Sequence, residues 1–375
     1  MSGPLNGWRV PAAKAARTLA SSLTTARLTA TTVAEDLVRS RPEDPLAERD
    51  PEYIRATLET NELLSRLYFR PKVRGLEHIP AKGPVLLVGN HSGGTLIADT
   101  FAFAFAFYNY FGPERRFYQL AHDLAVKMPG VSSLLRRYGT VSASHENAEK
   151  ALEQGAAVLV YPGGDWDSYR PSWHSDQVEL AGRTGFVRLA LTGDVPIVPV
   201  VAIGGQETAL FITRGERAAK ALKLDRFRLK VLPLQFAPPW GFTVLDLPGR
   251  VPLPSQITIE VLPRIDLRKR FGPEPGEQEV YNALVEEMQR ALDALAEERD
   301  VPVLGKVGPR TERGPVPDDI ALGEPWRGYD DMTVKQIAER LGDEPDEAVA
   351  ALRRYESAHR RRKGVLRAAE RRSHA

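Results

Sequence analysis

The sequence predicts an α/β fold in which a mostly parallel sheet is flanked by helices, with N-terminal helices before it and a C-terminal helical tail after it. From Pro84 onward, short apolar runs alternate with stretches of helical periodicity, and this alternation is typical of parallel sheets. Separate helical periodicity before residue 70 and after residue 328 predicts the flanking helices. Functional sites in such folds usually lie beyond the carboxyl ends of the strands.

The predicted strands are short apolar runs bounded by turn residues. In order they cover residues 72–75, 85–89, 117–120, 140–141, 157–161, 196–203 and 256–262. The predicted helices cover residues 10–38 and 52–68, stretches that end at 107 and 135, and residues 145–154, 186–191 and 278–298. In residues 10–38 apolar side chains recur three and four positions apart, which places them on one face of a helix.

The chain divides into four predicted parts. Residues 1–70 form an N-terminal helical region, residues 71–300 the α/β domain, residues 301–328 a linker rich in Pro and Gly, and residues 329–375 a small helical module. Proline and glycine without apolar periodicity are typical of a linker. Thr333 and Gln336 in the module have the spacing of a capping box, which marks the start of a helix.

Composition and charge exclude several classes of protein. The 375 residues carry 51 Lys and Arg against 49 Asp and Glu, a net charge of +2, so a globally basic nucleic-acid binder is excluded and no nucleic-acid partner is expected. The chain contains no cysteine. This excludes a disulfide framework, a thiol nucleophile and a Cys-ligated metal site, and no His has a second His at ligand spacing, so no metal is expected.

The N-terminal region is a candidate membrane-interface segment. Residues 1–34 carry four basic side chains and no acidic one, together with Trp8, a composition suited to an interfacial helix. Packing on the α/β domain and, more weakly, a transit peptide are the alternatives. No run reaches the roughly 18 apolar residues of a spanning helix, and no secretory signal is apparent. We therefore expect a cytoplasmic protein that associates peripherally with a membrane.

The most specific local feature is the end of the predicted strand at residues 85–89. Asn90, His91, Ser92 and two glycines follow this strand directly. A histidine at the carboxyl end of a strand is well placed to remove a proton from a bound nucleophile. A general base needs an orienting partner, and Asp99 reaches His91 if the glycines form a loop and Thr95 caps the next helix. The alternatives are a loop-bonded histidine and a polar residue on an apolar helix.

These residues resemble the first block of the glycerolipid acyltransferase superfamily, the lysophosphatidic acid acyltransferase-like enzymes. The usual form of that block is a His, four residues and an Asp, whereas seven residues separate His91 from Asp99. Residues 138–144, 158–164 and 195–200 resemble the second, third and fourth blocks in the right order. The third block reads Pro-Gly-Gly instead of the usual Pro-Glu-Gly-Thr, a form that is similar to the branch near the diacylglycerol and monoacylglycerol acyltransferases.

The resemblance implies acyl transfer from acyl-CoA or an acyl carrier protein, as co-substrate and without other cofactor, to a hydroxyl of a membrane lipid acceptor. In that family the His is the base and the Asp orients it, roles that fall on His91 and Asp99. Asp167 matches the acid that follows the Pro-Gly-Gly form.

Four further residues are candidates for substrate binding. Gly163 and Gly164 offer backbone N–H groups to an oxyanion, with a tight turn as the alternative. Arg170 and Arg183 are candidates for anion binding, with a solvated surface as the alternative.

Two other functions stay open from the sequence. The first is an acyltransferase specific for lysophospholipids, and the second is a non-catalytic lipid-binding or scaffold protein. The module at residues 329–375 resembles a small helical unit common in actinobacterial proteins, a resemblance that implies no chemistry. The acceptor, the acyl chain length and the oligomeric state are not predicted.

Overall fold

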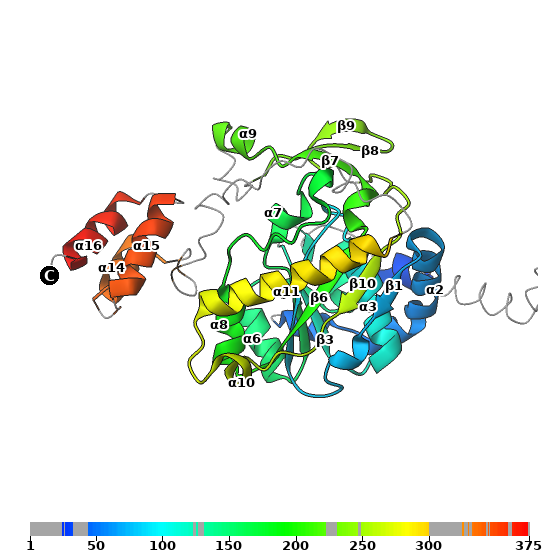
Figure 1. Cartoon of the computed structure of the whole chain (residues 1–375), viewed down its shortest axis with the longest axis horizontal. Helices are drawn as coiled ribbons and strands as arrows, with labels where there is room; N and C mark the ends of the chain where they lie inside the picture. Colours follow the sequence, from blue (N-terminus) through cyan, green and yellow to red (C-terminus); the bar gives the residue numbers. More distant parts are fainter. Residues whose placement is uncertain are drawn as a thin grey trace, which may run out of the picture.

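The computed structural model describes residues 25, 27–32, 44–122, 125–126, 131–222, 231–246, 249–299, 325, 329, 332–342, 344, 346–358 and 362–373. A seven-stranded sheet lies at the centre of the α/β domain (Figure 1), with the strand order β1-β10-β6-β2-β5-β3-β4. Its strands are β1 (Lys72–Arg74), β2 (Val85–Gly89), β3 (Phe117–Ala121), β4 (Thr140–Ser142), β5 (Ala157–Val160), β6 (Ile197–Ile203) and β10 (Thr258–Val261). Every neighbouring pair is parallel except β10 and β6, so the predicted mostly parallel sheet is confirmed.

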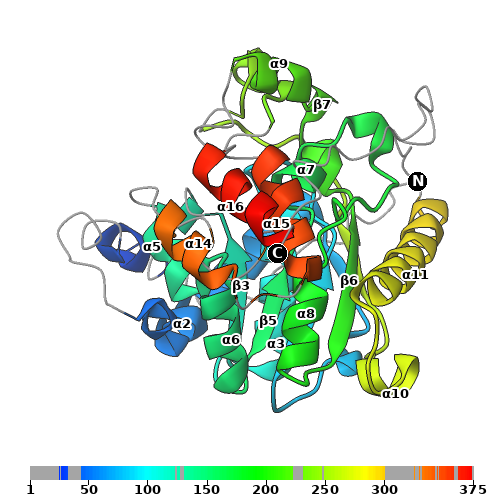
Figure 2. The same cartoon turned by 90° about the vertical axis from the view of Figure 1, so that its left-hand side faces the viewer.

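Helices cover both faces of this sheet (Figures 1 and 2). They are α2 (Pro51–Phe69), α3 (Ala98–Phe111), α5 (Val131–Arg137), α6 (His145–Glu153), α7 (Gly164–Ser168), α8 (Gly185–Thr192), α10 (Leu267–Phe271) and α11 (Glu277–Glu297). The helix α2 begins where the sequence signals it, because Asp50 accepts a hydrogen bond from the Tyr53 N–H and Pro51 takes the first helical position.

The side chains of β2 alternate between two hydrophobic cores. Leu86 and Val88 pack in the core formed with α6, α8 and α11, and Val85 and Leu87 pack in the core formed with α2 and α3. All five residues of β2 are buried, as expected for a parallel strand with helices on both faces. The strand therefore holds the chain rigidly up to Gly89, two residues before His91.

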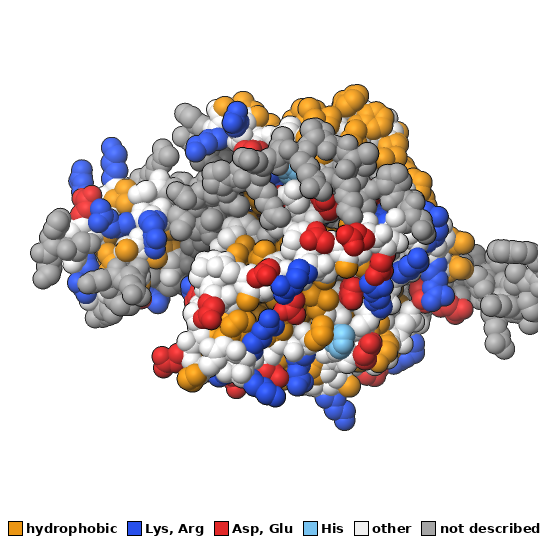
Figure 3. Space-filling model, in the orientation of Figure 1, with side chains coloured by type: hydrophobic (Ala, Val, Ile, Leu, Met, Phe, Trp, Pro, Cys, Tyr) orange, Lys and Arg blue, Asp and Glu red, His pale blue; other side chains and the backbone are white. Residues whose placement is uncertain are grey.

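A second sheet, which the sequence did not predict, lies beside the main one. It is antiparallel, with the order β7-β8-β9, and comprises β7 (Leu210–Thr213), β8 (Leu234–Ala237) and β9 (Gly241–Val244). The short helix α9 (Glu216–Ala221) follows β7. In Figure 3 apolar side chains gather on the surface over β8 and β9. Each strand has only four residues, too few for a clear period-two pattern.

The described parts of the two terminal regions are helical. Residues 27–32 lie in a helix, and the remainder of the helix predicted at residues 10–38 lies outside the described residues, apart from residue 25. In the tail, α14 (Val334–Arg340) starts at the predicted capping box of Thr333 and Gln336, and α15 (Asp346–Ala358) and α16 (Lys363–Ser373) follow. The tail helices bury a cluster made only of tail residues, among them Ile337, Leu352 and Val365. Of the predicted linker, residue 325 alone is described.

Candidate active site

The carboxyl end of β2 is fixed by the side chain of Asn90. Its amide nitrogen donates to the Ala202 carbonyl at 2.9 Å, and its amide oxygen accepts from the Ala202 N–H at 2.8 Å. Asn90 is fully buried and continues the pairing of β2 with β6 by one residue through its side chain. His91 consequently leaves the sheet from a fixed point at its carboxyl edge.

The His91 ring lies against the ring of Tyr161, with centroids 4.3 Å apart and planes inclined by 22°. The Tyr161 ring has room because Gly89 lies beneath it: a Cβ at Gly89 would come within 2.5 Å of that ring. The Tyr161 hydroxyl accepts a hydrogen bond from the Thr100 hydroxyl at 2.9 Å. Burial raises the pKa of Tyr161 well above its usual value, so this phenol stays neutral and serves as a packing surface for the imidazole.

The two nitrogens of the His91 ring have different surroundings. The side chain is 13% exposed and its Nδ1 lies 3.7 Å from Asp99 Oδ2. Nδ1 itself is buried and has no hydrogen-bond partner among the described residues, so the exposed part of the ring is elsewhere. A distance of 3.7 Å is within ion-pair range but too long for a hydrogen bond. Such contacts often tighten only when substrate binds.

Asp99 lies in the first turn of α3 and is buried. Its Oδ2 accepts from the Ser92 N–H at 3.1 Å and from the Ser92 hydroxyl at 3.0 Å, and its Oδ1 accepts from the Thr100 N–H at 2.7 Å. Burial acts to raise the pKa of Asp99, but the charge of His91 and these hydrogen bonds together lower it. Asp99 is therefore a carboxylate at neutral pH.

A turn between His91 and Asp99 brings the two side chains together. Gly93 and Gly94 have φ angles of +91° and +66°, values that favour glycine because a Cβ is strained there. Thr95 is not the helix cap that the sequence predicted, since α3 begins only at Ala98. The Thr95 N–H and hydroxyl instead donate to Asp246 Oδ2 at 2.7 and 2.6 Å, which ties the turn to the segment after β9.

Asp167 and Arg170 hold the backbone of His91 from both sides. The His91 N–H donates to Asp167 Oδ2, and Arg170 Nη1 donates to the His91 carbonyl at 2.6 Å. The two side chains also form an ion pair at 2.6 Å and are 0% and 1% exposed. Burial raises the pKa of Asp167 to about 6, against the opposing influence of Arg170 and the His91 N–H.

The candidate substrate-binding residues of the third block are engaged within the protein. The solvated alternative for Arg170 is wrong, because its buried guanidinium also donates to the His174 carbonyl at 3.1 Å, and its charge faces Asp167. Arg183 donates to the carbonyls of Pro162 at 2.9 Å and Gly163 at 3.3 Å. Its Nη2 lies 3.6 Å from Asp165. In this structure neither arginine presents the open cation that a phosphate would require.

The glycine pair forms a tight turn between β5 and α7. The Gly164 N–H, offered by the sequence to an oxyanion, donates to the Tyr161 carbonyl at 3.0 Å. A Cβ at Gly163 would approach the Glu179 carbonyl oxygen and the Asp167 Cβ to 2.4 Å. The alternative interpretation of these glycines, a strand-to-helix turn that permits close packing, therefore describes their structural role.

The sequence analysis did not identify Gln206, because no motif or spacing pattern marks this residue. Its amide oxygen accepts from the Gly93 N–H at 3.2 Å and its amide nitrogen donates to the Arg170 carbonyl. Gln206 follows β6, more than 100 positions from Gly93, so only the fold brings them together. Tyr161 belonged to a recognised block, yet its contact with His91 depends on the glycine at residue 89.

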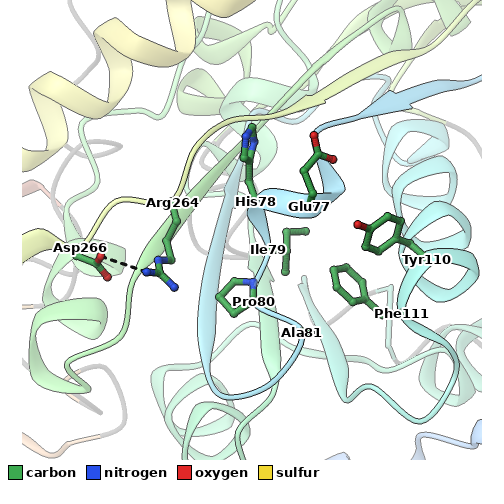
Figure 4. A pocket seen from close by; sticks show the side chains of 9 residues that line it. All are labelled: Glu77, His78, Ile79, Pro80, Ala81, Tyr110, Phe111, Arg264 and Asp266. Atoms are coloured by element: carbon green, nitrogen blue, oxygen red, sulfur yellow. Dashed lines mark ion pairs between the residues drawn. The ribbon is translucent and has the colours of Figure 1, made fainter.

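A pocket of about 510 Å³ lies at the opposite end of the sheet, away from His91 (Figure 4). Ile79, Pro80 and Ala81 line it just before β2 begins, and Tyr110 and Phe111 point into it from the last turn of α3. Arg264 and Asp266 form an ion pair at 3.5 Å on its other side. None of the residues around His91 lines this pocket.

In the described part of the chain, no group of three or more His, Cys, Asp or Glu side chains is arranged to hold a metal ion. None of the helices in the same part has the length and apolar character needed to cross a bilayer.

Comparisons with known proteins identify an acyltransferase domain in this chain. Residues 70–203 match the family model named Acyltransferase. An uncharacterized protein of Mycobacterium tuberculosis is 30% identical over 189 residues, 50% of each chain. The human protein named "DGAT1/2-independent enzyme synthesizing storage lipids" is 28% identical over 198 residues, 51% of this chain and 56% of that protein. The chain thus spans about half the length of these relatives.

The chain is also similar to a solved structure, that of the 1-acyl-sn-glycerophosphate acyltransferase PlsC of Thermotoga maritima. It covers 76% of this chain and 98% of its own, with a TM-score of 0.44 and 18% identity. The region that matches the family model contains His91 and Asp99. Residues 70–203 match an acyltransferase domain, and this match together with the relatives supports the glycerolipid acyltransferase superfamily.

Proposed function

We propose that the protein transfers a fatty acyl group from an acyl thioester to a hydroxyl of a glycerolipid acceptor, with His91 as general base. The observation that carries this proposal is the buried Nδ1 of His91 facing the Asp99 carboxylate. That arrangement keeps a proton on Nδ1 and leaves Nε2 to accept one, as an orienting carboxylate does for a catalytic histidine.

The proposed reaction has two proton transfers, both through His91. Its Nε2 removes the proton of the acceptor hydroxyl as the oxygen attacks the carbonyl carbon of the thioester. The carbon–sulfur bond then breaks, and the thiolate takes the proton from the imidazolium. Asp99 stabilises the imidazolium, and its lowered pKa keeps it ionised throughout.

The pairing of charges near His91 favours an acceptor without a phosphate. Arg170 is paired with Asp167, Arg250 with Asp246 at 2.7 Å, and Arg183 lies beside Asp165. A buried arginine already neutralised by a carboxylate has little left to attract a phosphate. The names of two relatives, the human storage-lipid enzyme and a fungal diacylglycerol O-acyltransferase from Eremothecium gossypii, support the same choice, a mono- or diacylglycerol hydroxyl.

The proposal includes peripheral association with a membrane, because such an acceptor resides in a bilayer. The acyl donor is a thioester of coenzyme A or of an acyl carrier protein, as the sequence resemblance implies. A lysophospholipid acceptor and a non-catalytic lipid-binding role are the two competing functions.

A labelled-substrate experiment tests the proposal against both. The full chain is incubated with labelled acyl-CoA or acyl carrier protein and with a monoacylglycerol, a diacylglycerol or a lysophospholipid, and the lipids are analysed by mass spectrometry. We expect an acylated neutral glyceride, with a rate about 10²–10⁴-fold lower for His91→Ala. A thioester that stays intact with every acceptor would support the non-catalytic function. Preferential acylation of the lysophospholipid would overturn the neutral acceptor.

The chain offers a matched control in His78. Its Nδ1 lies 2.8 Å from the Val261 carbonyl at the other end of the sheet. We expect His78→Ala to retain the wild-type rate per folded molecule, with folding of both variants checked by thermal unfolding. Equal rates for His91→Ala and His78→Ala would exclude His91 as the base.

A further inference from the structure

The small antiparallel sheet carries apolar side chains on both faces. Its inner face carries Phe211 and Ala237, which are buried against Tyr169. Its outer face carries Phe236, which is 36% exposed, and Phe242, which is 69% exposed. An antiparallel sheet at the surface of a soluble protein usually has a polar outer face. The outer face of β7, β8 and β9 is therefore more apolar than is usual for a sheet face exposed to water.

The exposed side chains on this sheet form one continuous surface. Phe236 and Phe242 are opposite each other in the strand register, and their ring centroids are 5.1 Å apart. Leu210 is opposite Phe236 on the other side, and Trp240, 51% exposed, lies in the turn between β8 and β9. In Figure 3 this surface is the largest gathering of apolar side chains at the top of that view. We call it the apolar sheet face, comprising Leu210, Phe236, Trp240, Phe242 and Val244.

The apolar sheet face is connected to the turn that follows His91. Asp246, two residues after β9, accepts from the Thr95 N–H at 2.7 Å and from Gln235 of β8 at 2.8 Å. Arg250 pairs with Asp246 at 2.7 Å and also donates to the Gly93 carbonyl. Hydrogen bonds and an ion pair hold all of these groups in place. A partner that binds to β8 and β9 would therefore lie at a fixed position relative to His91.

The segment that joins β7 to β8 is basic. Residues 215–230 contain six Lys and Arg and two Asp and Glu, in a chain whose total net charge is only +2. Arg217 and Lys220 are exposed on α9, and the apolar Leu222 beside them is 63% exposed. The strands and helix between Leu210 and Val244 thus carry both exposed aromatic side chains and exposed cations, a combination that suits binding to the interface of an anionic membrane.

We propose that the apolar sheet face docks on an anionic lipid bilayer, with Trp240 and Phe242 entering the interface. A second copy of the chain is the less favoured occupant, because it carries the same basic segment and like charges repel each other. The proposal deepens the proposed function, since it places His91 beside the bilayer that holds the acceptor. Docking itself can be measured without any turnover.

Vesicle binding of the full chain is the first test. Sucrose-loaded vesicles of phosphatidylcholine, with and without phosphatidylglycerol, are sedimented with wild type, Phe242→Ser, Trp240→Ser and the control Tyr110→Ser. Tyr110 is an exposed aromatic at the far end of α3, 55% exposed. We expect each sheet-face variant to bind about tenfold more weakly and the control to bind as wild type does. Equal loss in the control, or no loss in Phe242→Ser, would overturn the proposal.

Tryptophan fluorescence gives a second readout that a folding defect would not imitate. Brominated phosphatidylcholine quenches an indole that enters the acyl region, so the bound wild-type protein should be quenched and Trp240→Phe should lose that quenching while still binding. Unchanged quenching in Trp240→Phe would place another tryptophan in the membrane. A concentration-dependent dimer that Phe242→Ser abolishes, with vesicle binding unaffected, would assign the face to a second copy instead.

Activity measurements separate this proposal from the proposed function. Phe242→Ser should lose about tenfold in rate on acceptor in anionic vesicles and keep the wild-type rate on acceptor in detergent micelles. His91→Ala should lose activity in both, with vesicle binding unchanged. If no acceptor is acylated by wild type, the function fails while the binding assays still decide the docking surface.

Discussion

Arg170→Met is the variant that best separates a positioning role from a substrate-binding role. The Arg170 guanidinium is buried, pairs with Asp167 at 2.6 Å and donates to the carbonyls of His91 and His174. Removing one partner of a buried ion pair costs about 3–5 kcal/mol, because the remaining charge is left uncompensated. We expect a loss of that size in the free energy of unfolding, measured by urea denaturation, for Arg170→Met. The loss for Asp167→Asn should be smaller, because burial already raises the pKa of Asp167 and so favours its neutral form.

The double variant Asp167→Asn/Arg170→Met measures the coupling energy between the two side chains. Because it removes both charges, its loss should be smaller than the sum of the two single losses by at least about 2 kcal/mol. A backbone shift of roughly 1 Å at His91 can cost about 10²-fold in kcat, so all three variants should have low kcat per folded molecule. Arg136→Met is the control, since Arg136 is also buried, pairs with Glu48 at 2.6 Å and does not contact His91.

Three outcomes would refute this account. Additive losses in the double variant would show that Asp167 and Arg170 do not act as a pair. Unchanged stability of Arg170→Met together with a raised KM would instead assign Arg170 to substrate binding, as the sequence first suggested. A fall in kcat for Arg136→Met as large as that for Arg170→Met would show that the activity loss is not specific to the contacts with His91.

Four further predictions follow from the structure and the chain organisation. Asp99→Asn should lower kcat by about 10²–10⁴-fold with little change in KM, because the imidazolium loses its stabilising charge; a wild-type kcat would remove Asp99 from the mechanism. The pKa of Asp167 is raised from 3.8 to about 6, so the folded state holds this proton more tightly than the unfolded state. The free energy of unfolding should therefore fall by about 3 kcal/mol as pH rises from about 4 to 6, a decline that urea titrations of Asp167→Asn should lack. Deleting residues 1–38 should weaken flotation with anionic vesicles, and insolubility of the truncated chain would favour packing on the domain. Cutting the chain after residue 305 should preserve acyl transfer in detergent, whereas a lower kcat with unchanged thermal unfolding would place the tail in the active site.

Most of the α/β domain could be predicted because its elements are long or fully buried. The run at 85–89 is apolar throughout and became β2, and the periodic stretch at 278–298 became α11, within one residue at each end. The strands β7, β8 and β9 were missed since each has only four residues. Their stability comes from contacts such as those of Phe211 with Tyr169, which the sequence alone does not reveal.

The candidate site divides in the same way. His91 and Asp99 were found because both belong to one local segment, where a strand, two glycines and a helix limit the possible geometry. The contacts of Asp167 and Arg170 with the His91 backbone span more than 70 positions. The side chains of Asp167 and Arg170 point toward His91 because the tight turn at Gly163 lets α7 begin close to the end of β5. The family resemblance pointed to Asp167 and the charge of the side chain to Arg170, but neither could tell an inward arginine from an outward one.

The spacing between His91 and Asp99 has a structural explanation in this chain. Seven residues intervene instead of the four of the usual motif, and the turn at residues 93–95 lies among them. This turn supplies the Gly93 carbonyl that accepts from Arg250 and the Thr95 N–H that donates to Asp246. Asp246 is bonded in turn to Gln235 of β8. A four-residue spacing has three residues fewer, and residues 93–95 are three residues that include both of these contacts. The longer motif and the small sheet are therefore one structural unit, in which the same turn that returns Asp99 to His91 also holds the apolar sheet face in place.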